Sequence, residues 1–564
     1  MKTATRLLFL ASFVWMLGCP WIRSEAAAGE PPKAGIRNCV TEWMYTSAKV
    51  YSDPCNEVEL EVVITGPDRV EQRVPAFWSG GQTWRVRYSP RTTGQYTYRT
   101  LCSDTQNVYL DGQQGKFEVK DYEGDNPLYR RGAVEVAADK RHFAQADGTP
   151  FFWLGDTWWM GLCQRLKWPE DFQTLAADRV KKGFSVIQIV AGLYPDMPEF
   201  DARGANEAGF PWDKEKKHLN PAYFDAADRR IQYLVEQGLV PSIVGCWGYH
   251  LPMYGEAAMK KHWRNLVARW GAYPVIWCLA GEGSMPYYLS EHREQDVAQQ
   301  KHGWTEIARY VRGIDPYRRP LSIHPSNNAR DVVEDASVLD FDMLQTGHSD
   351  RASLPGTIRQ ITNSLARLPR MPVVNAEVCY EGILEASREE VQRLMFWADI
   401  LSGAGGHTYG ANGIWQVNTQ DQPFGPSPHG RSWGDTPWDA ASQLPGSGQL
   451  GLGKALLKRY EWWRLEPHPE WAQPHWTEQN YVQPYAAGIP GELRLVYVPA
   501  SWNLPRLANL ETNVIYQGFL FNPSNGKEIP LGRIQGDEEG KWKPPVPPIV
   551  RDWVMVLRRE GGPG

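Results

Sequence analysis

The amino-acid sequence predicts an α/β protein: a (β/α)8 TIM barrel flanked by an N-terminal and a C-terminal β-sandwich. Three observations support this prediction. Residues 36–120 alternate between apolar and polar with period two, residues 128–464 alternate short apolar runs with amphipathic segments, and period two returns in residues 465–560. Period two is the spacing of strands with one buried face, whereas apolar runs separated by helical segments are typical of βα units.

Residues 1–28 have the features of a secretory signal peptide. Basic residues precede the apolar run "LLFLASFVWMLG", and Ala26 and Ala28 have the small-x-small spacing of a cleavage site. Cys19 offers an alternative, a lipoprotein cleavage site with an anchored chain. No later apolar run reaches the ~18 residues of a membrane helix. We therefore expect an exported protein, periplasmic or extracellular, without a membrane span.

Composition narrows the range of partners. The 564 residues carry a net charge of -5 without a long block of one sign, so nucleic acid is not expected as a partner. The chain has 26 Trp and 25 Tyr, and aromatic rings in grooves stack on sugar faces, although such rings also fill ordinary cores. The sequence gives no prediction of the oligomeric state.

The cysteines give no metal signature. Removal of the signal peptide leaves seven, with no C-x-x-C pair, so neither a zinc site nor another cofactor is expected. Cys39, Cys55 and Cys102 lie in the first predicted domain, where export would permit one disulfide. The sequence leaves open which pair, if any, is bridged.

The predicted barrel rests on apolar runs followed by helical segments such as "AYFDAADRRIQYLVEQGL". A doubly wound sheet is the alternative, but no G-x-G-x-x-G or P-loop pattern follows any run. In the last domain, Asn525-Gly526 predicts a hairpin turn. The eight expected strand regions are residues 151–159, 184–192, 239–248, 275–283, 320–326, 339–348, 372–382 and 403–413.

The polar and aromatic residues at the ends of these runs are the candidate site, because (β/α)8 enzymes place their active sites at the C-terminal ends of the strands. Two glutamates are the catalytic candidates, and the others are expected to bind substrate. The candidates are Glu282 and Glu377, with Asp156, Trp158, Trp159, Trp247, His250, His324, Gln345, His348, His407 and Tyr409.

The two glutamates follow the fourth and seventh strands, on roughly opposite sides of a barrel. Gly281 and Gly283 flank Glu282, and we expect them to allow a sharp turn and leave room for a ligand. Two opposed carboxylates are the catalytic groups of glycoside hydrolysis, in which one protonates the leaving oxygen and the other attacks the anomeric carbon. Glu381 is interpreted instead as a solvated loop charge.

Other roles for these residues are weighed against that chemistry. Asp156 could bind a sugar hydroxyl or cap a turn. The histidines His324, His348 and His407 could be metal ligands, but a metal-dependent amidohydrolase barrel begins with H-x-H, and here the first strand has "LGDTWW". We therefore expect no metal.

The chain resembles the apiosidase-like glycoside hydrolases, a (β/α)8 family often flanked by β-sandwiches. "FFWLGDTWW", "WGAYPVIWCLAGEGS" and "PVVNAEVCYEG" carry the resemblance in the barrel, and "SPRTTGQYTYR" and "FLFNPSNGKEIPLG" carry it in the flanking domains. It implies that Glu282 is the acid/base and Glu377 the nucleophile. Gly281 departs from the Asn that often precedes the acid in related barrels, so the resemblance implies the mechanism but not the sugar.

The resulting expectation is a secreted, retaining, exo-acting glycosidase that cleaves plant or algal polysaccharide fragments. Long segments at 198–221 and 418–446 would wall one end of the groove, because long loops in compact folds are usually functional. The alternative is a binding protein on a barrel that has lost catalysis, whose terminal domains hold a polymer or matrix protein. In that case both glutamates would be dispensable.

Overall fold

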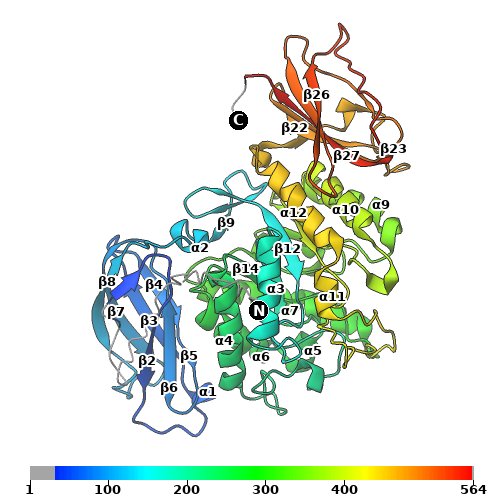
Figure 1. Ribbon diagram of the computed structural model, residues 1–564. Coiled ribbons are helices and arrows are strands. Elements are labelled where there is room, and N and C mark those ends of the chain that lie inside the picture. The colour runs from blue at the N-terminus through cyan, green and yellow to red at the C-terminus, as the bar shows by residue number, and fades with distance from the viewer. Residues whose placement is uncertain (1–31, 33, 562–564) are drawn as a thin grey trace, which may run out of the picture.

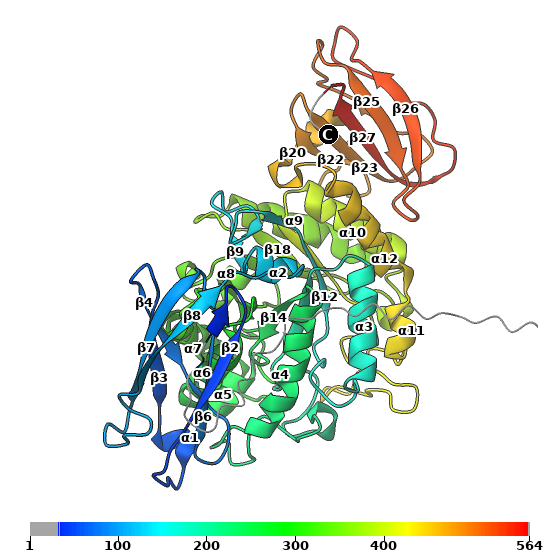
Figure 2. The same ribbon diagram turned by 60° about the vertical axis from the view of Figure 1, so that its left-hand side comes forward.

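A computed structural model describes residue 32 and residues 34–561. The predicted signal peptide and Cys19 lie outside the described residues. Figure 1 shows an N-terminal β-region, a central barrel and a C-terminal β-region in sequence order, and Figure 2 shows that the two β-regions contact different sides of the barrel. Within residues 34–561, no helix combines the length and apolar character needed to cross a membrane.

The N-terminal region packs a five-stranded sheet, in the order β1-β8-β7-β3-β4, against a three-stranded sheet, β2-β6-β5. The core between them is rich in aromatic side chains, including Trp43, Trp84 and Phe117. Cys55 and Cys102 carry free thiols, so no pair among the three cysteines of this region is bridged. The elements are β1 (Ala34–Ile36), β2 (Thr41–Thr46), α1 (Pro54–Glu57), β3 (Leu60–Thr65), β4 (Glu71–Pro75), β5 (Phe77–Trp78), β6 (Thr83–Tyr88), β7 (Gly94–Cys102) and β8 (Gln114–Lys120).

A short segment connects the N-terminal region to the barrel and covers the end of the barrel where the strands begin. It contains α2 (Pro127–Arg130) and a small sheet of β9 (Val134–Val136), β10 (Phe143–Gln145) and β11 (Pro150–Phe151). The Phe143 ring lies 5.3 Å from the rings of Trp153 and Phe341. These apolar contacts fill the end of the barrel opposite to the strand C-termini.

The eight predicted strands form one parallel sheet in the order β16-β15-β14-β13-β12-β19-β18-β17, which is a nearly closed barrel. The two end strands, β16 and β17, do not pair as a ladder. They are linked where the Ser322 Oγ donates to the Phe341 carbonyl at 2.7 Å and the Asp340 N–H donates to the Leu321 carbonyl at 2.8 Å. The strands are β12 (Trp153–Thr157), β13 (Val186–Val190), β14 (Val240–Val244), β15 (Ile276–Cys278), β16 (Leu321–Ser322), β17 (Asp342–Gln345), β18 (Val373–Glu377) and β19 (Gly406–Tyr409).

Helices cover the outside of the barrel, as the amphipathic segments predicted. In α4 the Asn220 side chain accepts from the Ala222 N–H and Pro221 occupies the first turn, both typical of a helix start. Gly238, with φ of 78°, lies just beyond its end. The helices are α3 (Glu170–Lys181), α4 (Pro221–Glu236), α5 (His250–Tyr254), α6 (Glu256–Trp270), α7 (Arg293–Ile314), α8 (Ala329–Val332), α9 (Leu354–Ala366), α10 (Glu389–Leu401), α11 (Trp438–Ser442) and α12 (Pro445–Leu457).

The C-terminal region is a six-stranded antiparallel sheet, with a two-stranded sheet of β21 and β24 sharing its core. The predicted sandwich therefore has one large and one very small layer. Gly526, with φ of 76°, forms the predicted hairpin turn between β25 and β26. The strands are β20 (Glu466–Pro467), β21 (Ala472–Gln473), β22 (Tyr485–Ile489), β23 (Leu493–Ser501), β24 (Arg506–Leu507), β25 (Tyr516–Phe521), β26 (Glu528–Ile534) and β27 (Arg551–Arg559).

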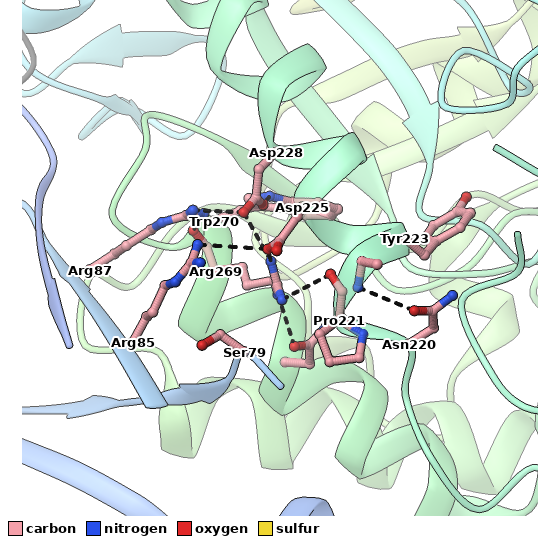
Figure 3. A network of polar contacts seen from close by, with 12 residues as sticks. Ser79, Arg85, Arg87, Asn220, Pro221, Tyr223, Asp225, Asp228, Arg269 and Trp270 are labelled. Atoms are coloured by element: carbon pink, nitrogen blue, oxygen red, sulfur yellow. Dashed lines mark hydrogen bonds and ion pairs between the residues drawn. The ribbon is translucent and has the colours of Figure 1, made fainter. Parts of the chain in front are cut away.

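Buried ion pairs join both β-regions to the barrel. Figure 3 shows Arg87 of β6 and Arg269 of α6 converging on Asp228 of α4, whose carboxylate lies 2.6 Å from the Arg87 Nη2 and 2.9 Å from the Arg269 Nη1. At the other interface, Arg393 of α10 lies 2.6 Å from Asp552 of β27. Charges buried this deeply need their partners, so the contacts fix each region against the barrel.

Candidate active site

The two candidate glutamates lie at the C-terminal edge of the barrel. Glu282 lies four residues beyond the end of β15, and Glu377 is the last residue of β18. In barrel order these are the fourth and seventh strands. The carboxylates interact electrostatically, since the charge of Glu377 contributes to the pKa of Glu282. The structure thus brings together the pair that the sequence selected.

A register shift directs Glu377 toward the barrel mouth. Leu344 of β17 pairs with Asn375 of β18, but the next residue, Gln345, pairs with Glu377, so β18 contains one extra residue. The Asn375 amide bonds outward to Asp399 of α10 at 3.0 Å. Without the shift, residues 375 and 377 would point to the same face. Bulges of this kind re-aim side chains beside active sites.

Glu282 lies in a strained turn whose glycines have a different role from the predicted one. Glu282 itself has a φ of 43°, in the left-handed region that side chains rarely adopt. A Cβ on Gly281 would lie 2.1 Å from the Trp247 ring, and one on Gly283 would lie 2.5 Å from Ile323. The glycines therefore make room for these neighbouring side chains, so the expectation that they leave space for a ligand was wrong.

The surroundings of Glu377 favour its ionised form. One carboxylate oxygen accepts from the Gln345 amide at 2.9 Å and lies 2.7 Å from the His348 Nε2, while the other lies 3.3 Å from the His324 Nε2. Burial opposes ionisation, but the contacts with His324 and His348 outweigh it, and the pKa of Glu377 falls well below its usual range. Burial lowers the pKa of His348, but its interactions with Cys379 and Glu377 outweigh this and raise it to about 10. His348 is therefore cationic at neutral pH.

The surroundings of Glu282 favour its protonated form. Burial first, and then the charge of Glu377, raise the pKa of Glu282 to about 7, with a smaller contribution from Asp196. The nearby Gln345 amide opposes the shift without reversing it. Part of the Glu282 side chain stays accessible, as a proton donor to substrate requires. The two carboxylates thus have opposite shifts, the pattern that separates a general acid from an ionised partner.

Two of the predicted aromatic residues, Trp159 and Trp247, lie beside His324, one of the two histidines that contact Glu377. The Trp159 ring lies 5.5 Å from that of Trp247 and 5.3 Å from that of His324, both edge to face. The buried indole N–H of Trp247 has no hydrogen-bond partner among the described residues. Buried polar groups are normally paired, so this donor is available to a polar ligand.

Five of the predicted binding residues do not lie with the carboxylates. Asp156 and Trp158 bond to each other at 2.7 Å, and Asp156 is 2.6 Å from Arg179 of α3. His407 lies 2.7 Å from Asp399 of α10. In β12 and β19 these residues face the helices, whereas Trp153 and Thr408 face the lumen and bond to each other at 3.0 Å.

The remaining corrections concern Tyr409, His250 and Glu381. The Tyr409 hydroxyl donates to Glu381 at 2.5 Å, and Glu381 also accepts from the Gly446 N–H at 3.0 Å. Glu381 is fully buried, so its interpretation as a solvated loop charge was wrong. His250 begins α5, with its Nδ1 3.1 Å from the Trp247 carbonyl, and burial lowers its pKa to about 3. It is a neutral structural residue.

Two further residues near the carboxylates were not among the candidates. The Tyr380 ring lies 4.7 Å from the His348 ring, and burial first, and then the charge of Glu377, raise the pKa of Tyr380 well above its usual range. Its position three residues after Glu377 in "EVCYEG" could have indicated it. Asp196, whose charge acts on Glu282, follows the second strand in "LYPDMPEF". Among the described residues, no group of three or more His, Cys, Asp or Glu side chains could hold a metal ion.

Known proteins match this chain in family and in fold. Residues 137–464 match the family model of the apiosidase-like catalytic domain, and residues 39–103 match a domain of unknown function, DUF5060. A solved glycoside hydrolase superposes with a TM-score of 0.65 at 20% identity, covering 78% of this chain and 99% of its own. No curated protein matches the chain.

Two structures from Bacteroides vulgatus are also similar. One is a family 5 glycoside hydrolase, with a TM-score of 0.63, 19% identity, and coverage of 77% of this chain and 95% of its own. The other, provisionally assigned as a glycoside hydrolase, has a TM-score of 0.68 at 17% identity and covers 94% of this chain and 100% of its own. At these identities the structures support the fold, while the family model covers more than half of the chain. The chain therefore belongs to the apiosidase-like family of glycoside hydrolases.

Proposed function

We propose that this protein is an exported, retaining, exo-acting glycosidase that acts on plant or algal polysaccharide fragments. Glu377 is the nucleophile and Glu282 the acid/base in this proposal. The observation that carries it is the opposite protonation preference of the two carboxylates. A nucleophile must be ionised to attack, whereas an acid must hold its proton until the leaving oxygen needs it. The order of the two residues along the chain agrees with the family resemblance.

In the first step, a Glu377 oxygen forms a bond to the anomeric carbon while the bond from that carbon to the leaving oxygen breaks. Glu282 gives its proton to the leaving oxygen, so the first product departs as an alcohol. Glu282 is then ionised and takes a proton from water. The resulting hydroxide oxygen attacks the anomeric carbon and releases Glu377 as a carboxylate. Two inversions leave the configuration unchanged.

The contacts around Glu377 suit this sequence of charges. The Gln345 amide and the His348 imidazolium hold one carboxylate oxygen, at 2.9 and 2.7 Å, which limits rotation of the nucleophile. Their hydrogen bonds also favour the carboxylate as a leaving group in the second step. The charge of Glu377 disappears when the covalent intermediate forms, and the pKa of Glu282 falls with it. Glu282 then becomes a base when a base is required.

Two further observations support sugar binding in a pocket. The indole N–H groups of Trp247 and Trp415 and both amide atoms of Gln416 are buried without partners among the described residues, and sugar hydroxyls could pair with them. The long segments after β13 and β19 also meet, since an Arg203 Nη1 donates to the Phe424 carbonyl at 2.9 Å. Loops that close one end of a groove favour action at chain ends.

Export and the domain limits complete the proposal. The signal-like residues 1–28 support export, and removal at that site would leave β-rich regions at 36–120 and 465–560 around a catalytic region at 128–464. An exported chain could reach polysaccharide outside the cell either as a soluble protein or as a lipid-anchored one.

The test is hydrolysis of a panel of 4-nitrophenyl glycosides and defined oligosaccharides, followed by proton NMR of the first product formed. We expect turnover on at least one substrate, with the anomeric configuration retained. Release of the inverted anomer would contradict the double displacement. A folded protein that binds glycans without cleaving any of them, and whose binding survives loss of both glutamates, would instead be a binding protein.

A further inference from the structure

Asp196 lies in the loop after β13 (the β13 loop, residues 191–220), and its position is unusual for a charged residue. Only 8% of its surface is exposed, and its φ is 58°, in the left-handed region. The described structure gives it no arginine or lysine as an ion-pair partner. Burial accordingly raises its pKa, although hydrogen bonds from Ser427 and Tyr288 oppose the shift. A buried carboxylate without an arginine or lysine partner is costly, which makes Asp196 a candidate for a functional role.

The Asp196 carboxylate joins three loops through one oxygen. Its Oδ1 accepts from the Ser427 Oγ at 2.5 Å and from the Tyr288 hydroxyl at 3.0 Å. Ser427 belongs to the loop after β19 (the β19 loop, residues 410–437), and Tyr288 to the loop after β15 (the β15 loop, residues 279–292). The Asp196 N–H also donates to the Tyr288 hydroxyl at 3.2 Å. All three loops begin at the end of the barrel that holds the candidate site.

Aromatic residues extend this junction. The Trp433 indole N–H donates to the same Ser427 Oγ at 3.2 Å. The His429 ring lies edge to face with Tyr288 at 5.2 Å and with Trp433 at 5.9 Å. His429 is exposed, whereas Tyr288 and Trp433 are half-buried. The junction therefore has a polar centre and a partly accessible aromatic rim.

The junction lies close to the proton donor. The charge of Asp196 acts on Glu282, and the charge of Glu282 acts in turn on Tyr288. Glu282 and Tyr288 also belong to the same loop. A contact that ties this loop to the β13 and β19 loops consequently encloses the acid side of the site.

We infer that Asp196 is a positioning residue that joins the β13, β15 and β19 loops into one wall, and that this wall confines the enzyme to chain ends. The effect on substrate length rests on the proposed function. The contact that joins the three loops is a property of the free protein and does not depend on it. Removing the Asp196 carboxylate leaves Ser427 and Tyr288 without their common acceptor, and it frees the Ser427 hydroxyl that accepts from Trp433. The loops would then separate and admit longer chains across the site.

The experiment uses the full exported chain with Asp196→Ala and Ser427→Ala. Ser290→Ala is the matched control, because the Ser290 Oγ also donates to an aspartate, Asp296 at 2.5 Å, but outside the junction. Hydrogen exchange without substrate reports on the loops. We expect the β13 and β19 loops to exchange at least about tenfold faster in both junction variants, and the control to match the wild type.

Product analysis then reports on specificity. On size-fractionated plant cell-wall oligosaccharides, Asp196→Ala should raise kcat/KM on long chains relative to short ones and release internal fragments, while kcat on an active 4-nitrophenyl glycoside stays within about threefold. An isosteric Asp196→Asn keeps the acceptor and should keep the product pattern. Its basic pH limit should move down, because the charge of Asp196 no longer helps to raise the pKa of Glu282, while Glu377 still raises it and His348 still lowers it.

Each outcome bears on a separate claim. Unchanged exchange in Asp196→Ala would overturn the joint. Faster exchange with an unchanged product pattern would overturn the role in specificity. If the wild type cleaves no glycoside, the proposed function fails and its consequence for chain length fails with it, whereas the exchange result still decides whether Asp196 joins the loops.

Discussion

The ends of β15 and β18 each present a glutamate to the same barrel mouth, but they surround it differently. The loop after β15 holds Glu282 in a strained turn, where burial and two like charges raise its pKa. The end of β18 places Glu377 against an imidazolium, a second histidine and an amide, which stabilise its charge. Identical side chains can thus be prepared for opposite roles, and the neighbours rather than the residue type determine which role each one takes.

The largest effect is expected when Glu377, at the end of β18, loses its charge. In Glu377→Gln we expect kcat to fall by at least about 10⁴-fold on every substrate, because an amide cannot form the glycosyl ester. The pKa of Glu282, followed by carbon-detected NMR, should fall below about 7, because the charge that helps to raise it is gone. Glu381→Gln is the control: it changes a buried carboxylate of the same segment and should lower stability while sparing kcat. Equal losses of kcat in both variants would contradict the assignment.

Replacing Glu282, the proposed proton donor after β15, should lower activity by less, and by an amount that depends on the leaving group of the substrate. Glu282→Gln should lower kcat/KM by about 10² to 10⁴-fold where the leaving group is a sugar alcohol, which needs protonation. A 4-nitrophenyl leaving group needs none, so its release should be within about tenfold of the wild-type rate. If both substrates lost activity equally, Glu282 would not be the acid.

The pH dependence of kcat/KM reports the different pKa values of Glu282 and Glu377 in the unmodified protein. Glu282 must be protonated, so kcat/KM should decrease as pH rises through about 7, while the acidic limit set by Glu377 lies below the usual range. His348→Asn removes the imidazolium, raises the pKa of Glu377 and should bring an acidic limit into view, with a loss of about 10 to 100-fold in kcat. An unaltered acidic side in this variant would mean that His348 does not hold the nucleophile's charge.

The smallest expected effect concerns Trp247, whose ring packs against Gly281, next to Glu282. Trp247→Phe keeps a ring against Gly281 but removes the unpartnered indole N–H. Loss of one hydrogen bond to a sugar, about 1 kcal/mol, should raise KM roughly fivefold with little change in kcat. Trp158→Phe is the control, because Trp158 packs against Phe172 of α3 on the outer face of the strands. A KM that changes equally in both would indicate a packing effect.

The sequence was sufficient for the fold because its signals are periodic. All eight observed barrel strands lie within the eight predicted runs, and the helix predicted from "AYFDAADRRIQYLVEQGL" is α4. Apolar periodicity reports burial directly, which is why it predicts architecture. It could not predict that the last sheet has a small second layer, since the division of strands between layers depends on long-range pairing.

The site was harder to predict because strand ends do not reveal which way a side chain points. Alternation along β12 assigns Trp153 to the lumen and Asp156 to α3, so the candidate list contained residues from both faces. A one-residue bulge then reverses the alternation before Glu377, and no pattern in "VVNAE" marks it. Asp196 was missed since its importance comes from the meeting of three loops that are distant in sequence.

The buried ion pairs at the N-terminal interface couple the unfolding of the N-terminal β-region to that of the barrel. Arg87 supplies, from the sandwich, one of the two arginines that balance Asp228 inside the barrel's helical layer, so neither part reaches its final charge balance alone. We expect the N-terminal β-region and the barrel to melt in one calorimetric transition, and Arg87→Ala to lower its midpoint or split it in two. A chain trimmed to residues 121–464 would begin with that defect, so poor yield of such a fragment would reflect lost cooperativity rather than a catalytic role of the sandwich.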